Sequence, residues 1–282
     1  MTALQQIELL LQNQRKEYKL EVDNLLVSLK EIYKYREMLK NLVRKELRTR
    51  YKGSVLGFLW TFINPLLQLL VYTVIFSTVM RINIDRFYIF MFVALLPWIF
   101  FSTSVQSSSS TIISNKDLIK KIYFPRVVLP VSVVISGLMN MIFSFAIVFP
   151  ALIISGIGIT PAVIYLPIVM IAALIMTLGF SVLFSGLNVY FRDLEHILGI
   201  VIMAWFYFTP IVYPVEMIPE SFLRLFFLNP ITPIILGFRD ILYYGIAPNF
   251  AMLGINMILG LILLVFAFMV FLNLQKNFAE EI

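Results

Sequence analysis

The residues that could perform acid–base or metal chemistry gather in one short segment, "RDLEH" at positions 192–196. Asp193 and Glu195 place two carboxylates next to His196, the single histidine of the chain. A carboxylate pair at a membrane boundary could bind a metal ion or a diphosphate. Sequence alone assigns no serine or cysteine nucleophile to His196, and the chain has no cysteine. We therefore interpret His196 as an interfacial residue and predict no catalytic residue and no metal site.

Motifs for cofactor binding are missing as well. The sequence contains no HExxH helix, no EF-hand loop and no phosphate-binding loop of the form GxxxxGK[ST]. We predict that this chain binds no cofactor of its own and is not an enzyme by itself.

Composition indicates which solvent surrounds the chain. Of the 282 residues, 60 % are hydrophobic and 13 % are charged, whereas a soluble domain has about 25 % charged residues. So few charges could not cover a surface that faces water, and lipid must therefore surround most of the chain. The formal net charge of +6 could suggest nucleic-acid binding, but the positions of the cations argue against it.

Six apolar runs contain no Asp, Glu, Lys or Arg. A helix needs about 20 such residues to cross about 30 Å of hydrocarbon, and a spanning segment must satisfy its own backbone hydrogen bonds. The alternation typical of membrane barrel strands is missing. We predict an all-α integral membrane protein whose six transmembrane helices lie at approximately 56–80, 87–103, 131–155, 161–187, 197–212 and 251–272.

The positive charges are distributed unevenly between the two sides of these spans. Alternating the spans across the membrane puts 18 of the 22 Lys and Arg residues on the side of the termini, 12 of them within residues 1–53. The other side keeps Arg81, Arg86, Arg224 and Arg239. Cytoplasmic loops are the ones enriched in Lys and Arg, so we predict that both termini are cytoplasmic.

Residues 36–52 are expected to form a basic amphipathic helix. Leu39, Leu42, Val43 and Leu47 recur at helical spacing, and lysines and arginines fill most of the remaining positions. Such a helix lies along the inner face of a membrane and contacts anionic lipid. Residues 1–35 read as a cytosolic helical extension, and residues 53–282 as the membrane domain.

A second short helix is expected in the cytoplasmic loop after the second span. Ser114 or Asn115 could cap it, Asp117 lies in its first turn, and Pro125 ends it. A capped helix is more structure than a simple turn requires. An ordinary cytosolic loop is the alternative.

The outer stretch 214–249 is long for a loop and very apolar for one that faces water. Pro219, Pro230, Pro233 and Pro248 divide it into pieces that are too short to span. Thr232 followed by Pro233 suits the start of a helix. We predict two short helices that dip into the outer leaflet, because irregular backbone at that depth must lie against protein or a water-filled cavity.

The absence of acidic residues from the spans limits the possible mechanisms. All 16 Asp and Glu residues lie outside the six runs, whereas ion-driven transporters and cation channels usually place acidic groups there. The spans offer aromatic faces instead. A pore without ionisable groups must be driven from elsewhere, and the amphipathic helix and the short helix near residue 114 are suited to receive force from a partner that hydrolyses ATP.

Several segments together resemble one family, the membrane subunits of ABC-2-type exporters of cell-surface polymers, which include the O-antigen, capsule and teichoic acid permeases. The segments are "RKELRTRYKGSVLGFLWTFINPLLQLLVYTVIF", "KKIYFPRVVLP", "LNVYFRDLEHIL", "WFYFTPIVYP" and "LNPITPII". The resemblance covers nearly the whole chain after about residue 35, and about 35 residues precede the part that it explains.

The resemblance implies a homodimer of this chain with two separate nucleotide-binding subunits, which hold ATP and Mg. Residues 114–124 would be the main coupling helix against the ATPase, and "RDLEH" would be a second, smaller contact. The implied coupling residues are Asn115, Lys116, Asp117, Leu118, Lys120, Lys121, Tyr123, Phe124, Arg192, Asp193 and Glu195.

The resemblance also implies a substrate, a polymer on a polyprenyl pyrophosphate carrier that crosses the bacterial plasma membrane. Arg48, Arg50 and Lys52 lie where the pyrophosphate could enter. The implied conduit residues are Trp60, Phe62, Tyr72, Trp205, Phe206, Tyr207, Phe208 and Tyr213. The implied outer gate residues are Phe222, Phe226, Phe227, Phe238, Tyr243 and Tyr244.

Three functions remain open at this point. A polymer permease is favoured, with wall teichoic acid slightly ahead of O-antigen or another polysaccharide. An ABC-2 exporter of drugs or small lipids is the second. A membrane-embedded, lipid-linked sugar transferase is the third, and it would have to use Asp193 and Glu195. Gly53 and Gly57 match a small-xxx-small pattern, which predicts close packing at the start of the first span.

Overall fold

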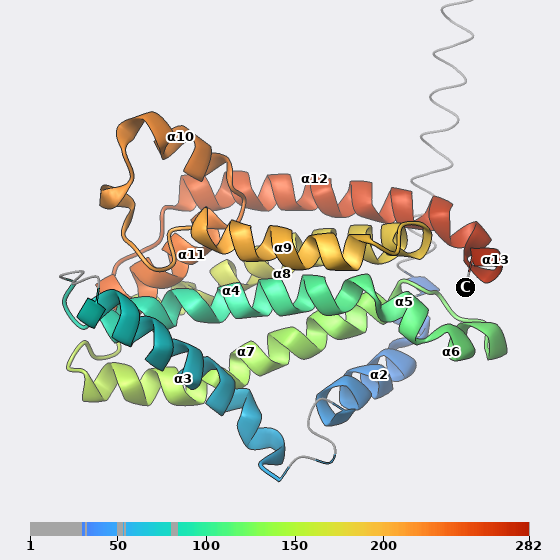
Figure 1. Ribbon diagram of the computed structural model, residues 1–282, viewed down its shortest axis with the longest axis horizontal. Coiled ribbons are helices and arrows are strands. Elements are labelled where there is room, and N and C mark those ends of the chain that lie inside the picture. Colours follow the sequence, from blue (N-terminus) through green and yellow to red (C-terminus); the bar gives the residue numbers. More distant parts are fainter. Residues whose placement is uncertain (1–29, 32, 50–52, 54, 80–83, 282) are drawn as a thin grey trace, which may run out of the picture.

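The computed structural model describes residues 30–31, 33–49, 53, 55–79 and 84–281, and all regular structure in this part of the chain is helical (Figure 1). The predicted all-α membrane fold is therefore confirmed. Four long helices run the length of the molecule: α4 (Phe87–Ser109), α7 (Val128–Ile154), α8 (Leu166–Tyr190) and α12 (Phe250–Leu274). Each is long and apolar enough to cross a membrane.

The first predicted span is a composite helix. The α-helix α3 (Trp60–Thr73) continues as a π-helical turn over Val74–Val79. The stretch Trp60–Ser77 of this composite helix has 18 residues and reaches the length of a span. Only 17 % of this segment is buried within the chain, so α3 presents most of its apolar surface outward.

The fifth predicted span differs from its expected bounds of 197–212. Helix α9 (Leu194–Tyr207) has 14 residues, which at 1.5 Å per residue is about 21 Å and less than the hydrocarbon thickness. The helix ends there because Pro210 disfavours helical geometry at Thr209 and lacks an amide donor. The chain turns through residues 208–213 instead of continuing outward.

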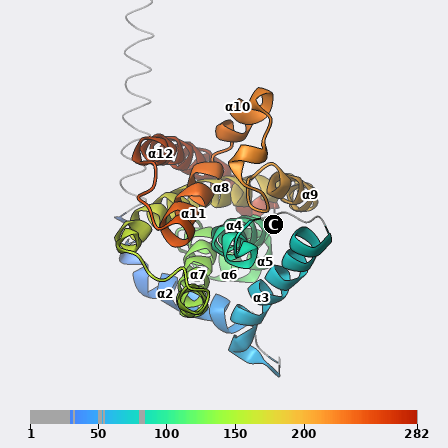
Figure 2. The same ribbon diagram turned by 90° about the vertical axis from the view of Figure 1, so that its left-hand side faces the viewer.

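Helix α4 is the centre of the bundle, with α3, α7, α8, α9 and α11 (Thr232–Arg239) arranged around it (Figure 2). Phe90, Met91, Val93 and Ala94 are fully buried, and the burial continues to Val105. A helix that is apolar on every side can be covered by lipid or by other helices, and α4 is covered by other helices, with 78 % of its most apolar stretch buried. Helix α4 is therefore the element against which the others are positioned.

Helices α8 and α12 pack along their length, and Gly179 and Gly260 are two of the glycines at this contact. A Cβ atom added to Gly179 would lie 2.9 Å from Cγ of Leu263 and 3.3 Å from the backbone nitrogen of Leu264. A Cβ atom on Gly260 would lie 3.2 Å from Cγ2 of Ile175. The two backbones approach this closely because neither glycine has a side chain.

Helix α2 (Arg36–Thr49) is the described part of the predicted amphipathic helix and packs on α7. Leu42 is buried, whereas Lys40 and Glu37 form an exposed ion pair of 2.9 Å. The hydrogen bond from Lys40 holds the pKa of Glu37 below its ordinary value. The amphipathic helix thus lies against the bundle, on α7.

The glycines before the first span do not pack closely, contrary to the prediction. Nothing lies within 4 Å of a Cβ atom added to Gly53 or Gly57, and both have positive φ angles of 82° and 47°. Glycine is used here because it adopts the left-handed backbone conformation at little cost. These residues shape the turn into α3 instead of a helix contact.

The outer stretch contains the two predicted short helices. After a 3₁₀ turn at Val215–Met217, α10 (Glu220–Leu228) and α11 (Thr232–Arg239) follow, and a π-helical turn over Asp240–Tyr244 extends α11. The bend between α10 and the α11 segment is 99°. The short helices α5 (Thr111–Ser114), α6 (Lys116–Lys121) and α13 (Phe278–Glu281) lie at the opposite end of the bundle (Figure 1).

The close approach of α8 and α12 gives a stability prediction. We expect Gly179→Leu to lower the free energy of unfolding by about 1–3 kcal/mol, because the added side chain overpacks the contact with Leu263. The measurement is thermal unfolding of the purified chain in detergent. Gly254→Leu on the same helix pair is the control, because a Cβ atom there meets nothing within 4 Å. Equal stability of the two variants would contradict the packing argument.

Candidate functional site

One end of the bundle carries the predicted coupling segment 114–124. Helix α6 projects beyond the end of α4 (Figure 1) and is followed by extended backbone at Ile122. Phe124 is buried in a cluster with Leu42 and Val127, and Leu118 packs against the same cluster. The apolar side of the segment therefore anchors it to α2 and α7.

The opposite side of this segment is open. Lys116, Asp117, Lys120 and Lys121 are exposed, as are the large apolar side chains of Ile122 and Tyr123, the latter with 83 % of its surface accessible. An exposed tyrosine and isoleucine among charged residues are typical of a protein contact.

Side-chain hydrogen bonds join the coupling segment to the amphipathic helix. Lys45 Nζ donates to Asn115 Oδ1 at 2.9 Å, and Asn115 Nδ2 donates to the carbonyl oxygen of Thr111 at 2.8 Å. The Tyr35 hydroxyl donates to the carbonyl oxygen of Tyr123 at 3.5 Å. Asn115 occupies the N-cap position of α6, but its side chain makes no cap hydrogen bond, so the predicted side-chain cap is wrong. Asn115 instead links α2, α5 and α6.

The "RDLEH" segment forms the turn between α8 and α9. The backbone N–H of Glu195 donates to Oδ1 of the fully buried Asn188 at 3.1 Å, and Gln106 Nε2 donates to the carbonyl oxygen of Glu195 at 3.0 Å. Asn188 and Gln106 were not expected from the sequence, because nothing in the local pattern pairs α8 and α4 with this turn.

The outward side chains of this turn are charged and aromatic. Arg192 and Asp193 are exposed, His196 is exposed, and Phe191 has 66 % of its surface accessible. Arg192 Nη2 also donates to the carbonyl oxygen of Glu281 in α13 at 3.3 Å. We call the exposed residues of the two segments the cytoplasmic platform, after the orientation that the charge distribution predicts: Lys116, Asp117, Lys120, Lys121, Ile122, Tyr123, Phe191, Arg192 and Asp193.

The predicted entrance cations are described only in part. Arg48 is exposed in the last turn of α2. Arg50 and Lys52 lie outside the described residues.

The aromatic residues predicted to line a conduit occupy different environments. Tyr72 of α3 stacks on Phe206 of α9 with ring centroids 5.4 Å apart, and Phe206 lies 5.7 Å from Trp98 of α4. Phe206 is buried, whereas Tyr207 and Phe208 are each 56 % exposed. Tyr72 and Phe206 thus hold α3 and α9 together, and the two following residues face outward.

Trp60 is not near this aromatic group. It lines a cavity of about 290 Å³ between α3, α4 and α7, together with Asn64, Gln68 and Asn140. Both polar side-chain atoms of Asn140 are buried without a hydrogen-bond partner among the described residues. Phe62 lies half-buried on α3. The first span therefore has a polar side toward α7 and an apolar side toward α9.

Asn229 connects the end of α9 to the outer helices. Its Oδ1 accepts from Trp205 Nε1 at 2.9 Å and from the Ile231 backbone N–H at 2.9 Å, and its Nδ2 donates to Thr209 Oγ1 at 2.8 Å and to the Phe208 carbonyl oxygen at 3.1 Å. Every hydrogen-bonding position of the amide is used. The Asn-Pro pair in "LNPITPII" signals a turn, but it does not indicate this partner set.

The predicted gate residues divide into a buried and an exposed group. Phe238 is fully buried against Phe145, and the Tyr243 hydroxyl donates to the carbonyl oxygen of Asp85. Phe226 contacts Phe208 and Tyr213, with ring centroids 6.3 Å apart in both pairs. The Tyr213 hydroxyl donates to the carbonyl oxygen of Tyr207. The remaining three, Phe222, Phe227 and Tyr244, are exposed.

Arg239 is the largest fully buried side chain of the described chain, with 1 % of its surface accessible. Its guanidinium carbon lies 3.6 Å from the ring centroid of Phe90, and Nη2 donates to the carbonyl oxygen of Ile211 at 2.9 Å. It therefore fastens α11 to α4 and to the turn after α9. The sequence had identified Arg239 only as one of the few outer-side cations.

Comparisons with known proteins agree over most of the chain. The family model described as "ABC-2 type transporter" matches residues 37–243. The O-antigen export system permease protein RfbA of Myxococcus xanthus is 40 % identical over 255 residues, which span 90 % of this chain and 98 % of that relative. A protein of the same description from Klebsiella pneumoniae is 37 % identical over 86 % of this chain and 94 % of its own length. The polysialic acid transport protein KpsM of Escherichia coli is 24 % identical over 77 % of this chain and 83 % of its own length.

Asn229 gives the second prediction. We expect Asn229→Leu to lower the free energy of unfolding by about 2–4 kcal/mol, because several half-buried donors and acceptors lose their partner at once. Trp205 fluorescence should shift to longer wavelength as the indole loses its bond and becomes wetter. Thermal unfolding and emission spectra in detergent measure both effects.

Asn249→Leu is the matched control, because its one side-chain hydrogen bond caps the exposed start of α12. Loss of a helix cap costs about 1 kcal/mol. If the two variants unfold alike and the spectra stay unchanged, Asn229 does not connect α9 with the outer helices.

Proposed function

Because this chain belongs to the ABC-2 type transporter family, we propose that it is the membrane-spanning permease subunit of an ATP-driven exporter of a cell-surface polysaccharide. The observation that carries the proposal is the likeness, along nearly the whole chain, to permeases named for O-antigen export. A multi-pass bundle with an exposed helical platform at one end supports it. We place both termini in the cytoplasm of a bacterial cell because of the Lys and Arg distribution.

ATP hydrolysis belongs to separate nucleotide-binding subunits, two for each pair of permeases. Each would hold ATP and Mg and contact the cytoplasmic platform. Movement of α6 would pass to α2 through the Lys45–Asn115 hydrogen bond and to α7 through the buried cluster around Phe124. The Lys45–Asn115 hydrogen bond and the apolar contacts around Leu42 both join α2 to the α6 segment, so the two helices would move as one unit.

The permease itself acts as a homodimer in this proposal. Exposed side chains on α9 form a stripe at positions i, i+3 and i+7: Ile200, Met203 and Tyr207. A similar stripe, Leu67, Leu70 and Val74, runs along α3 into the π-helical turn that follows it. The Tyr72–Phe206 stack holds the two helices together. A second copy of the chain facing these stripes would enclose an aromatic and aliphatic conduit between the two permeases.

The chemistry of these helices favours a polymer of neutral sugars. Neither α3 nor α9 contains a lysine or an arginine, and a phosphate-rich chain would need such cations along its path. Aromatic faces such as Tyr207 and Phe208 stack on sugar rings. We therefore propose an O-antigen-type polysaccharide as the substrate, ahead of wall teichoic acid. The preference for wall teichoic acid stays a prediction from the sequence. A polyprenyl pyrophosphate carrier would bring the pyrophosphate to Arg48 at the end of α2.

Changes in the cytoplasmic platform should separate ATP hydrolysis from export. We expect the double variant Lys121→Glu, Tyr123→Ala to reduce export at least about tenfold, because an anchoring tyrosine and a cation of the ATPase contact are lost. Both side chains are exposed, so membrane insertion should remain normal. Surface polysaccharide is measured by immunoblot in cells that lack the native gene.

Lys276→Ala, which removes an exposed cytoplasmic-end lysine outside the platform, is the control and should export normally. ATPase activity of the reconstituted complex should persist in the double variant. Normal export by the double variant would show that residues 121 and 123 are not part of a coupling contact.

The chain has no cysteine, which makes the dimer simple to test. We expect Met203→Cys on the exposed stripe of α9 to form a disulfide-linked dimer when membranes are oxidised with copper phenanthroline. Ile258→Cys, on an exposed position of α12, should stay monomeric. Non-reducing gels report the result. Cross-linking through α12 instead of α9 would replace the proposed dimer with a different one.

A further inference from the structure

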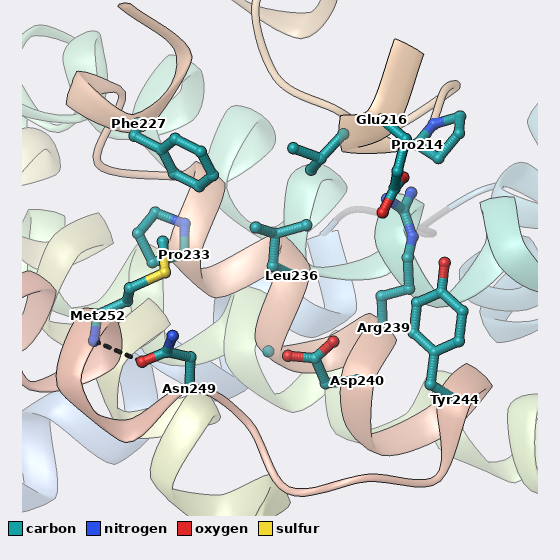
Figure 3. A pocket seen from close by; sticks show the side chains of 12 residues that line it. Pro214, Glu216, Phe227, Pro233, Leu236, Arg239, Asp240, Tyr244, Asn249 and Met252 are labelled. Carbon is teal, nitrogen blue, oxygen red and sulfur yellow. Dashed lines mark hydrogen bonds between the residues drawn. The ribbon is translucent and has the colours of Figure 1, made fainter. Parts of the chain in front are cut away.

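A cavity of about 270 Å³ lies under the outer helices and takes no part in the mechanism described above. The turn Val215–Met217, α10, α11 and the start of α12 surround it (Figure 3). Glu216 and Tyr244 are exposed on its wall, whereas Arg239 is almost completely buried. Because exposed residues contribute to the wall, a molecule outside the bundle could reach it.

One hydrogen-bond donor of Arg239 has no partner among the described residues. One nitrogen, Nη2, donates to the Ile211 carbonyl oxygen, and the guanidinium face lies over Phe90. Nε is buried and has no hydrogen-bond partner among the described residues. Leaving a buried polar group without a partner costs about 1–3 kcal/mol, so a partner supplied by a ligand in the cavity would stabilise the site.

Two carboxylates share the cavity with Arg239. Glu216 and Asp240 both line it (Figure 3). Within the described residues neither forms an ion pair of 4.0 Å or less with any cation, including Arg239. The site therefore contains one donor cation and two acceptor anions that influence one another electrostatically without a direct ion pair.

This combination selects the chemistry of a ligand. An anion would meet two carboxylates and a cation would meet the guanidinium, so neither sign of charge is complementary to all three groups. A neutral group whose hydroxyls both accept and donate can satisfy Arg239 and both carboxylates at once. Phe227 and Tyr244 add aromatic surface to the wall of the same cavity. Neutral polyhydroxyl groups with apolar ring faces are sugars.

We propose that this cavity binds one sugar residue of the exported polysaccharide through its hydroxyl groups. The proposal rests on the proposed function and on the placement of the outer helices at the end opposite α6 (Figure 1). A volume of about 270 Å³ is below the range of about 300–1,000 Å³ that drug-sized ligands occupy, which suits a single ring. The site would hold the emerging chain on the outer side and limit its return.

The test is a binding measurement on the full chain in lipid nanodiscs. The probe is an oligosaccharide released by mild acid from the surface polysaccharide of the host strain, titrated by saturation-transfer NMR. Loss of a hydrogen bond to a charged group is worth about 1.5–3 kcal/mol, so Asp240→Ala and Glu216→Ala should each raise Kd at least about tenfold. Glu220→Ala removes an exposed carboxylate that does not line the cavity and should bind as the unmodified chain does.

Thermal unfolding of each variant checks that the fold is intact, and Glu216→Ala decides the question if Asp240→Ala is unstable, because Glu216 is exposed. No probe binding by the unmodified chain, or equal binding by the cavity variants, would overturn the proposal. Deletion of the gene distinguishes a failure of the proposed export function from a failure of the proposed sugar site. If deletion leaves surface polysaccharide unchanged, the export function itself fails. If deletion abolishes export while the cavity variants bind normally, only the sugar site fails.

Discussion

A helix that crosses hydrocarbon must satisfy its own backbone and keep its charges outside, and this constraint organises the whole molecule. The four long helices α4, α7, α8 and α12 contain no acidic residue. Charged chemistry is confined to the two ends of the bundle. One end carries the platform on α6 and the α8–α9 turn, and the other carries the outer helices with Arg239.

The two ends are connected by helices of different rigidity. Helix α4 is covered on every side, and its residues from Phe87 to Val105 are nearly all buried. Close-packed interiors transmit displacement with little compression. A displacement applied near α5, which directly follows α4, would therefore reach the region of Phe90, where Arg239 lies over the aromatic ring. The buried cation thus joins the outer helices to the most rigid element.

Sequence reasoning predicted the helices well because their signals are local. Apolar length, the amphipathic pattern of α2, Pro125 after α6 and the Thr232–Pro233 start of α11 all act within a few residues. The end of α9 was placed too late because the apolar run continues past Tyr207, while Pro210 determines where the helix stops. Asn188, Asn229 and Arg239 were missed as organising residues because their partners lie on other helices. Neither the inward position of Phe206 nor the outward position of Tyr207 follows from composition.

The low burial of α3 has a mechanical consequence. Other helices surround α4. By contrast, most of the surface of α3 is exposed, and part of it borders the polar cavity that Asn64 and Asn140 line. Water in that hollow could exchange partners as α3 tilts, so few fixed contacts would have to break. Among the described spans α3 therefore has few contacts to break, and it can tilt at a lower cost than the buried helix α4.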